Sequence, residues 1–168
     1  MRKNFIVYYV LLVALQALLC NYFHFTPYLT VSILPVCIMC IPTKQSTISA
    51  LAAAFFTGLV IDLLADGVPG LNTAAILPVA LFRSDIFKLV FGDDVSVRGE
   101  DFTVRKYGFP KVSVAMVLAE IIFLSVYIFL DCGHIRPFGF VTLKFLLSVA
   151  VSTILAVFAT DIVTSDTK

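Results

Sequence analysis

The sequence predicts an all-α integral membrane protein, built as a compact bundle of six transmembrane helices. Hydrophobic residues make up 60% of the 168 residues and charged residues 14%, whereas a soluble domain is about 45–50% apolar and about 25% charged. A globule of this size buries only about 70% of its surface, so these apolar side chains need a second solvent, the lipid bilayer. The apolar runs are continuous, which favours helices over a barrel, whose strands alternate apolar and polar residues.

Six segments of one multi-pass membrane domain, residues 1–168, are candidate spans. A membrane-crossing helix needs about 17–25 mainly apolar residues. The first segment follows two basic residues, the third ends at a Gly/Asp turn, and the sixth follows a polar break at residues 131–134. The prolines at positions 27, 69, 110 and 137 lie at segment edges, where they start or end helices at little cost, whereas Pro78 lies inside the fourth span. The six predicted spans are residues 5–22, 27–42, 46–65, 71–91, 111–130 and 138–163.

Two of these spans depart from the ideal pattern. The second, residues 27–42, is short, and the fourth, residues 71–91, contains Arg83, Asp85 and Lys88. The purely apolar part of the fourth span is about 18 Å long at about 1.5 Å per residue, too short to cross alone. We expect it to cross with Arg83 and Lys88 extending their charged ends to the inner interface.

The basic residues predict the orientation of the bundle. Six crossings place both termini on one side, and the positive-inside rule makes that side the cytoplasm. Two basic residues, Arg136 and Lys144, then lie on or near the outer side. Ten lie on the inner side, namely Arg2, Lys3, Lys44, Arg83, Lys88, Arg98, Arg105, Lys106, Lys111 and Lys168.

The longest polar segment, residues 92–110, follows the fourth span on the cytoplasmic side. Residues 95–98 and 102–105 alternate around a Gly-Glu-Asp sequence, a pattern that indicates a β-hairpin. An isolated hairpin is marginally stable in water. We therefore expect this cytoplasmic loop to contact a partner, and its deletion to weaken that contact while leaving membrane insertion intact.

The remaining polar residues give little indication of chemistry. A net charge of +1 without a basic stripe argues against nucleic-acid binding. Cys37 and Cys40 form a C-x-x-C without a second ligand pair, so we interpret them as small apolar side chains on one helix face. Asp62 and Asp66 lie one helical turn apart, but no His, Ser or Cys lies beside them in the sequence. We expect no enzyme activity, no metal and no cofactor.

Two predicted spans carry small or polar residues at every fourth position, a pattern that lets helix backbones approach closely. The third span has Ser46, Ala50, Ala54, Gly58 and Asp62, and the sixth has Lys144, Ser148, Ser152, Ala156 and Thr160. We expect these two helices to pack antiparallel, with Asp62 in an ion pair with Lys144. In that register Gly58 lies opposite Ser148. Glu120, in the middle of the fifth span, is a competing partner for Lys144.

The most distinctive stretch joins the third and fourth spans. It carries Gly58 and Asp62, then the turn residues Asp66 and Gly67, then Gly70-Leu71-Asn72. Asp-Gly is typical of a tight turn, and Asn72 is a candidate cap for the fourth helix. We interpret the stretch as a structural corner through which the chain re-enters the membrane.

On these residues the chain resembles the MreD family, small membrane proteins of the bacterial rod-shape (elongasome) machinery. The resemblance rests on Gly58, Asp62, the Gly/Asp turn, and Gly70-Leu71-Asn72. It extends over most of the chain through the total length, the six spans, the Pro-Tyr-Leu opening of the second span, and the charged cytoplasmic segment.

The resemblance implies a non-enzymatic scaffold of the bacterial plasma (inner) membrane that controls cell shape. Such a protein pairs with MreC, which has a single span. Together they couple cytoplasmic actin-like MreB filaments to the synthases that build peptidoglycan. The resemblance also implies a fold like the substrate-binding subunits of vitamin transporters. The candidate structural or partner-binding residues are Gly58, Asp62, Asp66, Gly70, Asn72, Glu120, Lys144 and Ser148.

That likeness in fold supplies an alternative function, a small-molecule-binding membrane subunit of a vitamin-type transporter. Such subunits usually dock through an Ala-x-x-x-Ala face on the first helix, and Ala14 and Ala17 do not have that spacing. A binding pocket would also need polar and aromatic groups near the outer loops. The candidates are Tyr22, His24, Asn72 and His134.

Overall fold

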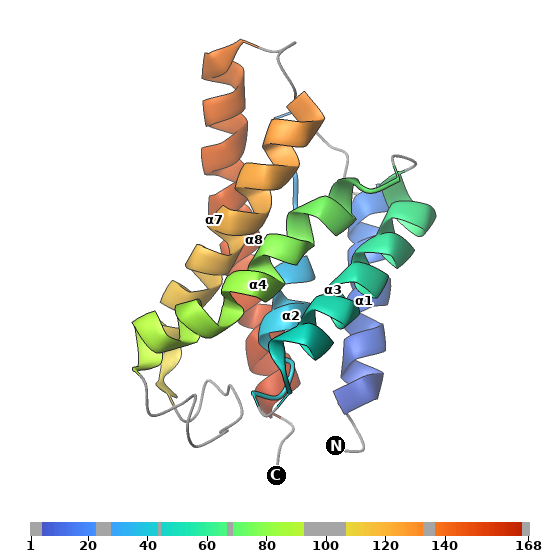
Figure 1. The fold of residues 1–168 in the computed structure, drawn as a ribbon. Coiled ribbons are helices and arrows are strands. Elements are labelled where there is room, and N and C mark those ends of the chain that lie inside the picture. Colours follow the sequence, from blue (N-terminus) through green and yellow to red (C-terminus); the bar gives the residue numbers. More distant parts are fainter. Residues whose placement is uncertain are drawn as a thin grey trace.

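The computed structural model of the chain is helical (Figure 1). It describes residues 5–22, 28–43, 45–66, 69–92, 107–132 and 137–165, and no β-strand occurs within these ranges. In chain order the elements are α1 (Phe5–Tyr22), α2 (Leu34–Met39), α3 (Thr47–Ile61), the π-helical turn η1 (Asp62–Asp66), α4 (Leu71–Phe91), α7 (Phe109–Cys132) and α8 (Phe138–Ser165).

Successive segments run in opposite directions through the bundle. In Figure 1, α1 begins and α8 ends at the lower end of the view, whereas α7 ends and α8 begins at the upper end. α3 packs along α4, α4 along α7, and α7 along α8. α1 lies at the margin and contacts η1, α2 and α3. The described ends of the chain therefore lie on the same face of the bundle.

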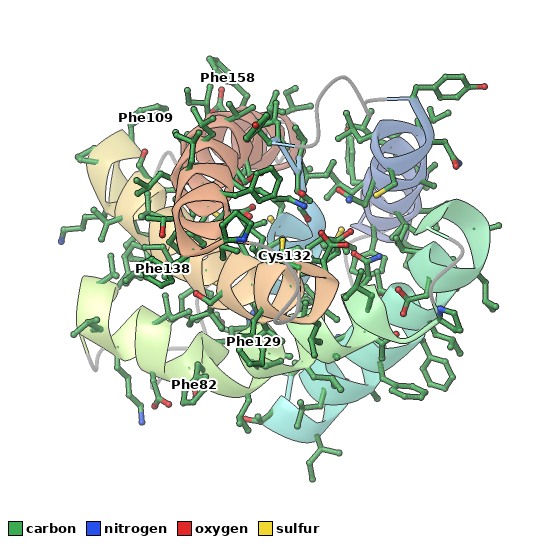
Figure 2. All side chains as sticks on the ribbon, turned by 90° about the horizontal axis from the view of Figure 1, so that it is seen from above. Phe82, Phe109, Phe129, Cys132, Phe138 and Phe158 are labelled. Carbon is green, nitrogen blue, oxygen red and sulfur yellow. The ribbon has the colours of Figure 1, made fainter. Side chains whose placement is uncertain are left out.

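The outer surface of the bundle is apolar. The helices long and apolar enough to cross a membrane cover Thr47–Leu64, Phe109–Cys132 and Phe138–Val163, and α1 adds a shorter apolar stretch, Ile6–Tyr22. Large apolar side chains point away from the core, and Phe82, Phe109 and Phe158 lie at the periphery in Figure 2. An apolar surface of this extent is unfavourable in water. These features are those of an α-helical membrane protein.

The second segment differs from the continuous helix expected over residues 27–42. Only Leu34–Met39 is helical, and residues 29–33 have no regular hydrogen-bonded structure. Every residue of α2 is buried, and α2 contacts all five of the longer helices. Pro35 lies in the first turn of α2, where its missing N–H removes no helical hydrogen bond. The centre of the bundle is therefore a short helix enclosed by the long ones.

Two local features position α3 and α4. Ser46 caps α3, because its hydroxyl accepts a hydrogen bond from the Ser49 amide. Gly70 precedes α4 with φ of +95°, a left-handed conformation that glycine adopts without a Cβ penalty. This turn brings the first residues of α4 back against the end of α3.

Candidate functional site

The Asp62 carboxylate caps the N-terminus of α4. Its Oδ2 accepts hydrogen bonds from the Gly70 amide at 3.0 Å, from the Thr73 amide at 3.1 Å and from the Thr73 hydroxyl at 2.6 Å. Its Oδ1 accepts from the Asn72 amide at 2.7 Å. The first amides of a helix have no partner within the helix and carry partial positive charge. Asp62 is only 2% exposed, so the amides at the start of α4 satisfy a buried carboxylate, which in turn satisfies them.

Gly58 lies one turn before Asp62, where α3 comes closest to α4. A Cβ at this position would lie 2.5 Å from the Cα of Thr73 and 2.9 Å from its amide nitrogen. Because both atoms belong to the backbone, a side chain cannot be accommodated by rotation. The small residue at position 58 thus allows the close approach that brings Asp62 within reach of α4.

The end of α3 and the start of α4 form one unit, which we call the α3–α4 corner. It consists of Gly58, Asp62, Gly70, Asn72 and Thr73. These contacts hold the end of α3 against the start of α4, in agreement with a structural purpose for this stretch. Asn72 is 1% exposed and lies in the first turn of α4, after Gly70, so its backbone amide rather than its side chain takes part in the cap. The Asp66 side chain and Gly67 lie outside the described residues.

The predicted Asp62–Lys144 ion pair is wrong. Lys144 Nζ lies 2.6 Å from Oδ2 of Asp131, at the end of the preceding helix. Glu120, the competing candidate, is not its partner either. α3 packs along α4 while α8 packs along α7 and contacts α2, so Gly58 faces Thr73 rather than Ser148. Asp62 is bound by the N-terminus of α4, whereas Lys144 on α8 is bound by Asp131 at the end of α7.

The small and polar residues at every fourth position of α8 contact the second segment rather than α3. All five residues at these positions are buried, as their predicted close packing requires: Lys144, Ser148, Ser152, Ala156 and Thr160. The Ser148 hydroxyl accepts a hydrogen bond from the Thr30 amide at 2.9 Å, and the Ser152 hydroxyl accepts one from the Ser32 amide at 3.0 Å. These small polar side chains let a non-helical backbone lie against α8.

A third side chain completes the support of this broken segment. Gln16, on α1, is 1% exposed, and its Oε1 accepts a hydrogen bond from the Ile33 amide at 2.7 Å. Non-helical backbone at membrane depth is tolerated only where protein groups satisfy it. Sequence reasoning missed both Gln16 and Ser32. The usable signal was the alternation of polar and apolar residues from Thr30 to Ile33, which is typical of extended rather than helical backbone.

Glu120 is the most unusual polar residue of the core. Its side chain on α7 is fully buried, and neither carboxyl oxygen has a hydrogen-bond partner in the structure as described. An isolated buried carboxylate is costly, so this position is not explained by helix packing alone. It stays a candidate residue, without a partner that assigns it a role.

Arg83 behaves differently from the neighbouring basic residue of α4. Lys88 is exposed, as expected for a side chain that reaches the interface. Arg83 is only 6% exposed, donates from Nη2 to the carbonyl of Ile41, and lies over the ring of Phe87 at 5.0 Å. The expected extension of Arg83 to the interface is therefore wrong, because the carbonyl at the end of α2 and an aromatic face hold it inside.

Several other expectations can be compared with the structure only in part. Within the described ranges no group of three or more His, Cys, Asp or Glu side chains has metal-binding geometry. Cys37 and Cys40 are free thiols, with Cys37 fully buried in α2. Residues 93–106, most of the segment predicted to be a cytoplasmic loop with a β-hairpin, lie outside the described residues. Comparisons of the chain with protein-family models, curated proteins and solved structures found no match.

Proposed function

We propose that the protein is a six-span, non-enzymatic scaffold of the bacterial inner membrane, of the MreD type. The observation that carries the proposal is the α3–α4 corner. The fold brings together into one unit the residues on which the resemblance rests, namely Gly58, Asp62, Gly70 and Asn72. Both oxygens of Asp62 are engaged in holding that unit, which supports a structural purpose for the motif.

The helix directions support six crossings. α1 has 18 residues and α4 has 21, which correspond to about 27 Å and about 32 Å at about 1.5 Å per residue. A hydrocarbon core is about 30 Å thick. Asp85 and Lys88 are exposed near the end of α4, close enough to the interface for their charged ends to reach headgroups. The second crossing is then made by the extended residues together with α2.

The proposed partners follow from the resemblance. An MreC-like single-span protein would bind within the membrane, and the complex would couple actin-like MreB filaments to the cell-wall synthases. The outward faces of the helices carry many exposed apolar side chains, for example Val10, Leu146 and Phe158. A single-span helix can pack on such a face by shape, since the hydrophobic effect does not drive helices together within lipid.

The alternative, a small-molecule-binding subunit of a vitamin-type transporter, requires a pocket near the outer face. A described cavity instead lies beside the start of α3, at the opposite end of that helix from the α3–α4 corner. This cavity is distinct from the outer pocket that the alternative requires, whose candidates His24 and His134 lie outside the described residues.

Co-purification tests the proposal. The tagged full-length protein is extracted in mild detergent from rod-shaped cells, and the captured proteins are quantified by mass spectrometry. We expect an MreC-like protein and peptidoglycan synthases to be enriched, and Asp62→Ala to reduce their recovery while Gly139→Ala, at an open position of α8, does not. Recovery of a transport ATPase with a bound small molecule would favour the alternative. Recovery of neither set would contradict both.

A further inference from the structure

A cavity with a partly polar lining lies between the start of α3 and α4. In Figure 1 the start of α3 lies on the same side of the bundle as the start of α1 and the end of α8. Its volume is about 180 Å³, and about 10–15 Å³ of such volume holds one water molecule. The cavity can therefore hold a group several times larger than water. It is lined by Thr43, Gln45, Ser46, Thr47, Ala50, Ala80, Arg83, Ser84 and Phe87.

Among the described residues that line this cavity, Arg83 provides the only formal charge. One edge of its guanidinium is held by the carbonyl of Ile41, and the ring of Phe87 covers one face. The Nε atom is buried and has no hydrogen-bond partner in the described part of the chain. No acidic side chain among the described residues forms an ion pair with Arg83. A buried cation without a counter-charge is costly, so this site is suited to an added anion.

The opposite wall of the cavity contributes donors. Ser46 caps α3, a helix of 15 residues, and Thr47 is the first residue of its first turn. The amides of a first turn point outward and favour an anion. The Ser84 hydroxyl lies on the α4 side of the same cavity. Because Ser46, Thr47 and Ser84 are exposed, the cavity is open to a ligand from the surroundings.

We propose that this cavity binds a phosphate-type oxyanion, with Arg83 as the counter-charge and the first turn of α3 as the opposing donor. Guanidinium groups form strong charge-assisted hydrogen bonds to phosphate. Basic pockets between membrane helices on the cytoplasmic side bind the headgroups of anionic lipids. The same chemistry would also accept free phosphate. Such a site is compatible with either of the two proposed functions.

The test measures thermal unfolding of the purified full-length protein in detergent, with three additions compared at equal ionic strength. These are phosphatidylglycerol, phosphatidylcholine and inorganic phosphate. We expect phosphatidylglycerol to raise the unfolding midpoint by about 5 °C, because a ligand that binds only the folded state stabilises it, and phosphatidylcholine to have little effect. A rise with inorganic phosphate as well would identify the free anion as a ligand. No rise with phosphatidylglycerol or with phosphate would overturn the proposal.

Three variants assign the effect to this cavity. Arg83→Gln removes the charge, and we expect it to weaken binding by about tenfold or more. Thr47→Glu leaves Arg83 in place and puts a carboxylate in the first turn of α3, where it favours the helix but repels an anion. Lys88→Gln makes the same charge change at an exposed position outside the cavity.

We expect the response to be lost in Thr47→Glu and retained in Lys88→Gln. Thr47→Glu decides the outcome if Arg83→Gln does not fold. A full response in Thr47→Glu would refute binding at this cavity. An equal loss in Lys88→Gln would also refute it, because the response would then reflect net charge.

Discussion

Replacing Gly58 with alanine should force α3 and α4 apart. The new methyl group would lie 2.5 Å from the Thr73 Cα, whereas ordinary contacts begin at 3.4 Å, so the helices must separate by about 1 Å in a packed interior that yields little. The Thr73 amide already lies 3.1 Å from Asp62 Oδ2. A shift of this size takes that hydrogen bond beyond its normal range.

The free-energy cost follows from three contributions. Overpacking costs about 1–3 kcal/mol, and each weakened interhelical hydrogen bond within a membrane costs about 0.6–1.7 kcal/mol. The exchange of glycine for alanine within a helix returns about 1 kcal/mol. Two of the hydrogen bonds to Asp62 come from Thr73. With two such hydrogen bonds weakened, we expect a net loss of about 1–5 kcal/mol, which lowers the unfolding midpoint by about 2–20 °C for a chain of this length.

The assay is thermal unfolding in mild detergent, followed by reaction of the buried Cys37 thiol with a fluorescent maleimide. Gly139→Ala is the matched control, because a Cβ at Gly139 meets nothing within 4 Å, and we expect a change within about 0.5 kcal/mol. Adding Thr73→Ala should not rescue Gly58→Ala, since the nearest atom belongs to the backbone. Equal midpoints for the two glycine variants would refute the close approach of α3 to α4.

Three further tests concern the polar side chains. Asp62→Asn turns one acceptor oxygen into a donor that faces helix amides, so we expect the free energy of unfolding to fall by about 2–5 kcal/mol. Unchanged unfolding would contradict the capping function. Asp131→Lys should restore the stability lost in Lys144→Asp, whereas Asp62→Lys should not, and the opposite result would return Lys144 to Asp62. Glu120→Gln should keep or raise the unfolding midpoint, because neither oxygen has a described partner, while a large decrease would reveal a pairing of the carboxyl group.

Several helix bounds could be predicted from the sequence because local chemistry sets them. The predicted spans 5–22 and 71–91 coincide with α1 and α4. A glycine in a left-handed conformation lies at each end of α4, and such residues are visible in the sequence as breaks in an apolar run. The second segment was predicted less well, since hydropathy alone does not distinguish a buried helix from a buried extended chain.

The sequence predicted that the small and polar residues of the candidate site pack closely, but it did not predict which residues they contact. Both rows at every fourth position indicated close packing, and Ala54, Gly58, Ser148 and Ser152 are indeed buried. The wrong step was to match the two rows to each other. Each row packs on a different neighbour, and Asp62 is satisfied by backbone amides, which are present in every helix and leave no mark in the sequence.

The sequence by itself determined that the chain is helical and apolar enough for a membrane, because both properties depend on composition and on the length of continuous apolar runs. Only the tertiary structure decided which helix faces which, and hence the partners of Asp62, Lys144 and Arg83. In water the core side of a helix is more apolar than its exposed side, and this difference predicts its orientation. In lipid both sides are apolar, so the orientation of each helix follows from packing and from the few polar groups that must find partners.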